Sequence, residues 1–363
     1  MSKSKGITED LLNWFEWNRR ELPWRENRTA YGTWVSETML QQTRVTTVIP
    51  YFTRFLSLFP DIPSLAGASQ EDVYKAWEGL GYYSRAGNLR KGAKFCTEHF
   101  AGELPDDYQK LLSIPGIGPY TAGAIASLVF GLPEPAVDGN VIRVFSRLYA
   151  LFIYPQDARA RAQVAMHVKR LLPEDQAGDF NEAVMDLGAS VCIPGNPNCG
   201  ICPLSADCEA FLIGKQADLP LRKSKKEIPV IPYTIVVLKK DDKLFIRQRP
   251  DSGLLANLFE FVSYPGLLSP QEITELLKRD YLILPDQISS ICSLGGSLHT
   301  FSHLKWEMEG FLVEISQDKK IPLPLLFAEK HSQGDYYPIS IAQKQAFPSA
   351  LKAYTSVVFQ ARS

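Results

Sequence analysis

The chain has 363 residues, of which 45% are hydrophobic and 22% charged, and its formal net charge is −1. This is the composition of an ordinary folded protein, long enough for two or three domains, and it leaves nucleic-acid binding open because such binding requires only a local gathering of basic residues. The sequence shows no apolar run that could cross a membrane, and its start, MSKSKGITED, lacks the apolar stretch of a signal peptide. We therefore expect a cytoplasmic protein without membrane contacts, whose six cysteines do not form a disulfide framework.

The first regular pattern spans residues 8–18, where apolar residues at helical steps follow Thr8, a suitable N-cap. The next residues, RRELPWR at 19–25, combine three arginines with one aromatic side chain. On its own this stretch indicates a solvated loop that Trp24 anchors in the core. The chain is thus predicted to begin with a helix followed by a basic loop.

A second helical pattern spans residues 31–55, with apolar side chains at steps of three and four. Glu37 and the polar run 41–44 lie close to its apolar face, which is unusual for a core helix. The later helical region breaks at 79–85, where GLGYYSR mixes residue types that stack on bases and neutralise phosphates. A helix–helix connection with buried tyrosines has the same composition, so both interpretations stay open.

The centre of the chain contains a turn at 115–118 (PGIG), followed by a helical run at 120–130. Two glycines one residue apart let the backbone turn sharply, and the next helix directs free N–H groups to the same place. That arrangement suits one phosphate group, although a tight turn between core helices has the same pattern. Asp138 follows in VDGNV, between apolar residues and a glycine. A hairpin followed by an aspartate resembles the helix-hairpin-helix DNA glycosylases, and this resemblance implies that the hairpin binds a DNA phosphate and that the aspartate carries the chemistry.

Four cysteines follow three further helical patterns between residues 141 and 191. Their spacing is C-x6-C-x2-C-x5-C, and they are Cys192, Cys199, Cys202 and Cys208. Four thiolates in one bent loop can wrap a tetrahedral centre, and both four-cysteine zinc sites and cubane iron–sulfur clusters use such ligands. Zinc sites more often show two C-x2-C pairs, whereas this loop has one.

The composition changes at residues 218–232, where DLPLRKSKKEIPVIP has basic residues and prolines without periodicity and predicts an extended linker. Beyond it we predict a separate α+β domain, with strands at 233–238, 243–249, 259–262, 298–306 and 308–315 and helices at 270–279 and 349–359. GLLANLFEF at 253–261 resembles the start of a Nudix-type fold. The Arg-Glu and Glu-Glu pairs of the Nudix catalytic box are missing, so a nucleotide hydrolase is not expected.

Taken together, these motifs resemble the adenine DNA glycosylases of the MutY type, within the helix-hairpin-helix, iron–sulfur DNA glycosylase superfamily. The resemblance covers nearly the whole chain. It rests on LPWR at 22–25, WVSETMLQQT around Glu37, WEGLGYYSRAGNL at 77–89, the 115–118 turn, VDGNV, the four cysteines with their 6-2-5 spacing, and HTFSH at 299–303. The fold that it implies is multidomain: an all-α helix-hairpin-helix glycosylase region with a [4Fe–4S] cluster loop, plus a C-terminal α+β Nudix-like domain.

The resemblance also implies domain limits. Residues 1–217 are expected to form the catalytic glycosylase region, in which about 29–130 is the helical barrel and the N-terminal helix joins 131–217 in an iron–sulfur subdomain. The linker at 218–232 then leads to a Nudix-like 8-oxoguanine-recognition domain at 233–363. The protein is expected to act as a monomer, nucleoid-associated in a bacterial-type cytoplasm.

Known members remove adenine paired with 8-oxoguanine, so the resemblance implies a monofunctional base-excision-repair glycosylase. It would hydrolyse the N-glycosidic bond of adenine opposite 8-oxoguanine or guanine in double-stranded DNA and leave an abasic site. Glu37 is expected to protonate adenine at N7 and handle the water, which requires a proton held near neutral pH. Asp138 is expected to stay ionised and stabilise the oxocarbenium ion, or bond to it, with Asn140 and Tyr120 orienting it. Bifunctional members carry a lysine in place of Tyr120.

The remaining site residues are carried over by the same resemblance. The adenine pocket is expected to be lined by Arg20, Trp24, Arg25, Leu40, Val45 and Glu182. Contacts with the opposite 8-oxoguanine and with DNA are assigned to Gln42, Thr43, Leu80, Tyr82, Gly116, Gly118, Phe301, Ser302 and His303. The cysteines Cys192, Cys199, Cys202 and Cys208 are assigned to a [4Fe–4S] cluster. Two alternatives stay open: a bifunctional pyrimidine glycosylase/AP lyase of the endonuclease III type, and a non-catalytic iron–sulfur DNA-binding protein.

Overall fold

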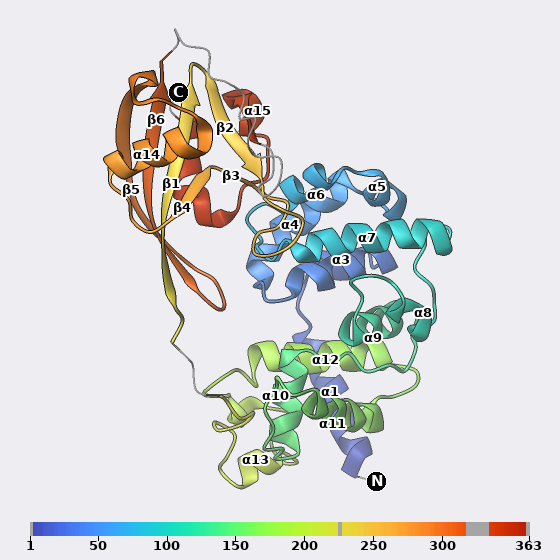
Figure 1. Cartoon of the computed structure of the whole chain (residues 1–363). Coiled ribbons are helices and arrows are strands. Elements are labelled where there is room, and N and C mark those ends of the chain that lie inside the picture. The colour runs from blue at the N-terminus through green and yellow to red at the C-terminus, as the bar shows by residue number, and fades with distance from the viewer. Residues whose placement is uncertain (1–2, 224–226, 317–333, 361–363) are drawn as a thin grey trace. The chain divides into compact units, whose positions relative to one another are not determined.

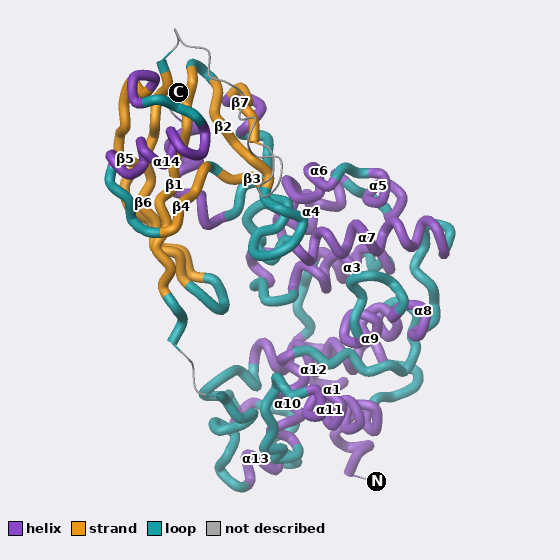
Figure 2. Tube along the Cα trace, viewed as in Figure 1, coloured by secondary structure: helices purple, strands orange, loops and turns teal. Residues whose placement is uncertain are grey.

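The computed structural model describes residues 3–223, 227–316 and 334–360. The chain divides into two compact units, one formed by Met1–Ala68 and Gly87–Lys225 and the other by Ser69–Ala86 and Lys226–Ser363. The first unit is helical and the second combines strands with helices (Figure 2), which confirms the predicted all-α region followed by an α+β domain. The sequence did not indicate that Ser69–Ala86 packs with the C-terminal unit. Among the helices of the described ranges, none has the length and apolar character that a bilayer crossing requires.

The helical unit is built from short helices joined by tight turns (Figure 1). Its elements are α1 (Lys3–Asn18), α2 (Pro23–Glu26), α3 (Ala30–Leu40), α4 (Val45–Leu58), α5 (Ile62–Gly67), α7 (Ser84–His99, which begins in the other unit), α8 (Tyr108–Leu112), α9 (Pro119–Leu128), α10 (Gly139–Leu148), α11 (Ala158–Leu171), α12 (Ala177–Ser190), the 3-10 helix η1 (Cys199–Ile201) and α13 (Glu209–Leu212).

Two sequence-based expectations in this unit are wrong. The helix predicted at 31–55 is broken, because the backbone leaves the helical conformation after α3 and Gln42 adopts a φ of +60°. Thr8 is not an N-cap, since α1 begins at Lys3, and its hydroxyl donates instead to the carbonyl of Leu171 at 2.8 Å. In both places a tertiary contact or a turn overrides local propensity.

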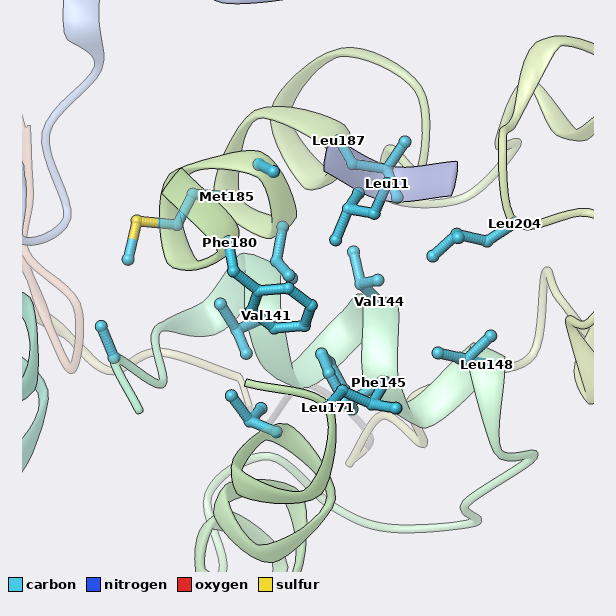
Figure 3. Close-up of a cluster of buried hydrophobic side chains, with 14 of the residues drawn as sticks. Leu11, Val141, Val144, Phe145, Leu148, Leu171, Phe180, Met185, Leu187 and Leu204 are labelled. Atoms are coloured by element: carbon cyan, nitrogen blue, oxygen red, sulfur yellow. The ribbon is translucent and has the colours of Figure 1, made fainter. Parts of the chain in front are cut away.

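The core of the helical unit lies between α1, α10, α11 and α12 (Figure 3). Phe145 of α10 and Phe180 of α12 are at most 1% exposed. Each such side chain contributes about 1.5–3 kcal/mol through removal of apolar area from water. Helices α10 and α12 approach closely because Gly188 has no side chain: a Cβ there would lie 2.7 Å from the Cβ of Asn140. This packing fixes the position of α10, whose first turn carries Asp138 and Asn140.

The second unit is a mixed sheet with strand order β3-β2-β1-β6-β5, in which β4 also pairs with β1 and β7 with β2. Its elements are α6 (Gln70–Trp77), β1 (Val230–Lys240), β2 (Lys243–Gln248), β3 (Phe259–Glu260), β4 (Val262–Pro265), α14 (Pro270–Tyr281), η2 (Pro285–Gln287), β5 (Ile288–Thr300), β6 (Lys305–Ile315), β7 (Gly334–Pro338), α15 (Ile339–Ala342), η3 (Ser349–Leu351) and α16 (Lys352–Gln360). The predicted 233–249 hairpin is confirmed as the antiparallel pair β1–β2.

The strand predicted at 298–306 is wrong. Strand β5 ends at Thr300 and β6 begins at Lys305, so residues 301–304 connect two antiparallel strands. Most of β5 was not predicted, because its sequence, ISSICSLGGSLHT, is rich in serine and glycine and lacks apolar alternation.

Helices cover both faces of the sheet, and β1 shows why. Ile235 and Val237 pack toward α16, whereas Val236 and Leu238, one residue out of phase, pack toward α14. A strand that is apolar on both faces must be covered on both. The sheet therefore lies in the middle of a three-layer unit.

Both ends of the predicted linker belong to folded structure. Leu219 is 1% exposed and its carbonyl accepts from Arg147 Nε at 3.0 Å, while residues from Val230 onward form β1. Residues 224–226 of the linker lie outside the described residues.

Candidate active site

The 115–118 turn connects α8 to α9 as a helix-hairpin-helix. Gly116 has a φ of +87°, and a Cβ at this position would lie 2.9 Å from the Cβ of Asn88. Gly118 is the N-cap of α9 and has no side chain to cap the helix, so the first N–H groups of α9 stay available. Ile114 and Ile117 are buried, whereas Gly116 and Gly118 are exposed. The turn thus presents backbone donors to solvent from a fixed base.

Asp138 is the N-cap of α10. Its carboxylate accepts from the backbone N–H of Val141 at 2.7 Å and from Asn140 Nδ2 at 2.8 Å, as predicted for Asn140. Burial raises the pKa of Asp138, and these two donors oppose the rise. The positive end of the α10 dipole also favours the ionised carboxylate and so opposes the rise in the pKa of Asp138. The local structure therefore fixes the orientation of one buried carboxyl group, and its hydrogen-bond donors oppose the rise in pKa that burial causes.

Glu37 lies on α3 and is 5% exposed. Burial raises the pKa of Glu37 to about 7, a rise that the Tyr120 hydrogen bond opposes and the Asp138 charge assists. A carboxyl group of this kind holds its proton near neutral pH and can act as an acid.

The predicted role of Tyr120 needs correction. Its hydroxyl donates to Glu37 Oε2, and no hydrogen bond from it to Asp138 is found in the described structure. The reason is the placement of α9, which packs directly against α3 (Figure 1). Burial and the neighbouring carboxylates raise the pKa of Tyr120, so it remains a donor. Tyr120 therefore orients the carboxyl group of Glu37, while Asn140 orients that of Asp138.

A cavity of about 890 Å³ brings these groups together. Its lining includes Glu37, Tyr120, Asp138 and Asn140, together with all six residues expected in the adenine pocket, namely Arg20, Trp24, Arg25, Leu40, Val45 and Glu182. Gln42, Thr43 and Gly118 also line it. The volume is in the range of small-molecule sites, so one purine base and its sugar can be enclosed.

Behind the cavity lies a buried acid that the sequence analysis missed. Asp186 is 0% exposed and accepts from Arg20 Nε at 2.8 Å and from Arg25 Nη1 at 2.9 Å. Although burial opposes it, these hydrogen bonds hold the pKa of Asp186 below its ordinary value. Glu182, four residues earlier on α12, bonds Arg25 at 2.9 Å and Arg28 at 2.7 Å. The signal in the sequence was the i, i+4 spacing of Glu182 and Asp186 within the mostly apolar run that ends α12.

The other predicted contact residues lie elsewhere. Leu80, Tyr82 and the 301–303 loop belong to the second unit. Leu80 is buried at 7% exposure, whereas Tyr82 is 47% exposed. Ser302 and His303 are both exposed, with 3.4 Å between Ser302 Oγ and His303 Nδ1.

Comparison with known proteins agrees with this geometry. Residues 35–169 match the HhH-GPD superfamily of base excision DNA repair proteins, and residues 233–356 match the NUDIX domain. The adenine DNA glycosylase of Buchnera aphidicola subsp. Schizaphis graminum is 36% identical over 307 residues, which cover 84% of this chain and 87% of the relative. The chain belongs to the adenine DNA glycosylases. The human adenine DNA glycosylase is 35% identical over 367 residues, covering 84% of this chain and 66% of the relative.

Solved structures agree with the fold of an adenine DNA glycosylase. A thermostable thymine-DNA glycosylase superposes with a TM-score of 0.54 at 26% identity, covering 58% of this chain and 97% of that one. A trapped endonuclease III–DNA covalent intermediate gives 0.51 at 22% identity, with 59% and 99% covered, and shows the shared fold. The enzyme acts in base excision repair, where it removes adenine from DNA by hydrolysis of the N-glycosidic bond.

The cysteine loop of this adenine glycosylase packs beside α10. Cys192, Cys202 and Cys208 pack against the hydrophobic core of the helical unit. Arg147, at 1% exposure, donates to Cys192 Sγ at 3.2 Å. Within the described ranges, no three His, Cys, Asp or Glu side chains lie close enough together to hold a single metal ion. A tetrahedral zinc site would bring its sulfur atoms to about 3.8 Å from one another.

Arg143 connects this loop to the catalytic end of α10. Its Nε donates to the carbonyl of Cys192 at 2.8 Å, and its Nη2 donates to Asn140 Oδ1 at 2.8 Å and to the Gly188 carbonyl at 2.7 Å. Asn140 in turn holds Asp138. The sequence analysis assigned Arg143 no role, because an arginine on an amphipathic helix is ordinarily a surface residue.

Proposed function

We propose that this adenine glycosylase acts on adenine paired with 8-oxoguanine, or with guanine, in double-stranded DNA and leaves an abasic site. The observation that carries the proposal is the cavity in which Glu37 and Asp138 meet, each oriented by a different partner. Residues 1–217 serve as the glycosylase region and 233–363 as the domain that recognises the opposite base. The target adenine must leave the duplex to reach the cavity, since its glycosidic bond is inaccessible in the stack.

Glu37 supplies the acid in this proposal. Its pKa of about 7 keeps the carboxyl group protonated for a large part of the time at neutral pH. Transfer of that proton to N7 makes adenine a better leaving group, and the carboxylate that remains can accept a proton from the attacking water. Tyr120 holds the carboxyl group in place through its hydroxyl.

Asp138 carries the negative charge that the sugar cation needs. In this proposal the Asp138 carboxylate is ionised: burial raises its pKa, and the Val141 N–H and Asn140 Nδ2, which donate to it at the N-terminus of α10, oppose that rise. Two carboxyl groups with separate tasks are also the arrangement of glycoside hydrolases. The two carboxyl groups in the cavity can support hydrolysis. A Schiff base with the sugar would require an amine, and no lysine occurs among the described residues that line the cavity. We therefore propose a monofunctional glycosylase.

The opposite base is read by a second set of residues. Gln42 and Thr43 lie on the turn after α3, at the rim of the cavity. Tyr82, exposed on its loop, is suited to stacking beside a base, and the buried Leu80 supports that loop. The exposed hydroxyl of Ser302, next to His303, is suited to a hydrogen bond with the additional oxygen of 8-oxoguanine.

The cysteine loop fits a [4Fe–4S] cluster as the resident group. Cys192, Cys199, Cys202 and Cys208 would hold it, since the four thiols influence one another electrostatically and three of them are anchored on the core. When bound, such a cluster cross-links the loop. Arg143, which donates both to the carbonyl of Cys192 and to Asn140 Oδ1, would then link the fixed loop to Asn140.

The test is single-turnover base release from duplexes with adenine opposite 8-oxoguanine, guanine or thymine. We expect release opposite 8-oxoguanine to be fastest, with strand breaks only after alkali. Asp138→Asn should abolish release and retain binding, whereas the exposed control Asp179→Asn should leave the rate unchanged. Strand breaks without alkali would show a lyase, and binding without release from any mispair would show a non-catalytic protein. Equal rates opposite 8-oxoguanine and thymine would contradict the proposed specificity.

A further inference from the structure

The loop between α6 and α7 has an unusual backbone. Gly79, Gly81 and Tyr82 all have positive φ, at +102°, +73° and +49°. For Tyr82, which has a Cβ, this left-handed conformation is strained. The loop exposes 47% of this side chain and buries Leu80. A strained conformation of this kind persists only where neighbouring residues determine it.

Some of the contacts that hold the loop in this strained conformation lie within the loop itself. Trp77 Nε1 donates to the Gly81 carbonyl at 3.2 Å, and Arg85 Nη2 donates to the same carbonyl at 3.1 Å and to that of Leu80 at 3.3 Å. The Arg85 guanidinium also lies 5.5 Å from the ring centroid of Tyr82. These contacts fix the middle of the loop.

The two ends of the loop are fixed by one residue of the C-terminal domain. The backbone N–H of Phe347 donates to Glu78 Oε1 at 3.1 Å, and its carbonyl accepts from the Tyr83 hydroxyl at 3.3 Å. The same Tyr83 oxygen accepts from the N–H of Gly79 at 3.4 Å. Glu78 precedes the loop and Tyr83 ends it, so both flanks of Tyr82 are attached to Phe347.

Lys75 extends this attachment. Its Nζ donates to Glu78 Oε2 at 2.6 Å and to the carbonyls of Gln343 and Gln345 at 3.0 and 3.1 Å. These carbonyls follow α15, so a cation at the end of that helix is favourably placed. Glu78 therefore joins a side chain of α6 and a backbone group of the C-terminal domain.

We propose that Glu78 and Tyr83 are positioning residues through which segment 343–347 sets the conformation of Tyr82. The proposal rests on the proposed function, in which Tyr82 contacts the base opposite adenine. The 301–303 loop belongs to the same compact unit as the Tyr82 loop. Two of the three elements that contact the opposite base in the proposed function, the Tyr82 loop and the 301–303 loop, are thus carried by one unit. Selectivity for 8-oxoguanine depends on the Glu78 and Tyr83 contacts that fix the first of them.

The test compares single-turnover adenine release opposite 8-oxoguanine and opposite guanine. Glu78→Ala should lower the ratio of the two rates about five- to tenfold, the factor expected for one or two hydrogen bonds. Tyr83→Phe should lower it in the same direction. Glu78→Gln still offers an acceptor to the Phe347 N–H and should retain most of the ratio. The exposed Glu71→Gln, about two helical turns earlier on α6, is the matched control.

A double-mutant cycle separates positioning from loss of fold. If Glu78 acts through Tyr82, then Glu78→Ala should change nothing further in a Tyr82→Ala background. Additive effects, or an unchanged ratio in Glu78→Ala with melting temperature preserved, would overturn the proposal. A wild-type enzyme without preference for 8-oxoguanine would overturn the proposed function instead, so the two failures are distinguishable.

Discussion

Replacement of Glu37 by glutamine should inactivate the enzyme and stabilise its fold. The glutamine keeps the shape of the side chain and still accepts a hydrogen bond from Tyr120, but it lacks the proton that the proposed mechanism transfers to adenine. The gain in stability follows from burial, which raises the pKa of Glu37 from 4.5 to about 7.

The sign and magnitude follow from proton linkage. Because the folded protein binds this proton more tightly than the unfolded chain, the unfolded chain ionises first as pH rises from 4.5. Stability contributed by this group therefore falls between pH 4.5 and about 7 and is constant above that range. At about 1.4 kcal/mol for each pH unit, the buried carboxyl group costs about 3 kcal/mol at about pH 8.

Urea unfolding of the full chain, followed by far-UV circular dichroism, measures this effect in the helical unit. Glu37→Gln should exceed wild type in free energy of unfolding by about 3 kcal/mol at about pH 8, and the difference should vanish toward pH 4.5. The exposed Glu21→Gln is the control and should show no pH-dependent difference. A Glu37→Gln variant that is equal to or less stable than wild type at about pH 8 would refute the burial argument.

Three further predictions follow from the site. Tyr120→Phe removes the hydrogen bond that lowers the pKa of Glu37, so the fall in single-turnover rate with rising pH should move to higher pH; a shift to lower pH would contradict this assignment. Gly116→Ala should cost about 1–2 kcal/mol of stability and weaken duplex binding in fluorescence anisotropy, because its φ is +87° and its Cβ would lie 2.9 Å from that of Asn88. Gly118→Ala, with no atom within 4 Å of its Cβ, should keep wild-type stability and serves as the control for folding. Arg143→Met should lower the rate of adenine release about tenfold, since Asn140 loses its charged partner; a wild-type rate would show that Asn140 needs no such support.

Several features of the fold followed from short stretches of sequence. The turn at 115–118 between two helices was predictable because glycine spacing and helix starts are local properties, and the family resemblance identified it as a helix-hairpin-helix. The β1–β2 hairpin was visible for the same reason, since apolar alternation reports on one strand at a time. The helix break at Gln42 was not visible, because the residues 41–44 carry neither proline nor glycine.

The amino-acid sequence alone identified the family, the two kinds of domain, and Glu37 and Asp138 as the candidate carboxyl groups. The hydrogen-bond partners of these groups became visible only in the folded structure. Tyr120 bonds Glu37 rather than Asp138, and Asp186 lies beneath the pocket arginines. The physical reason is that periodicity and capping describe interactions within a few residues, whereas a pKa or a hydrogen bond between helices depends on burial and on the packing of distant segments.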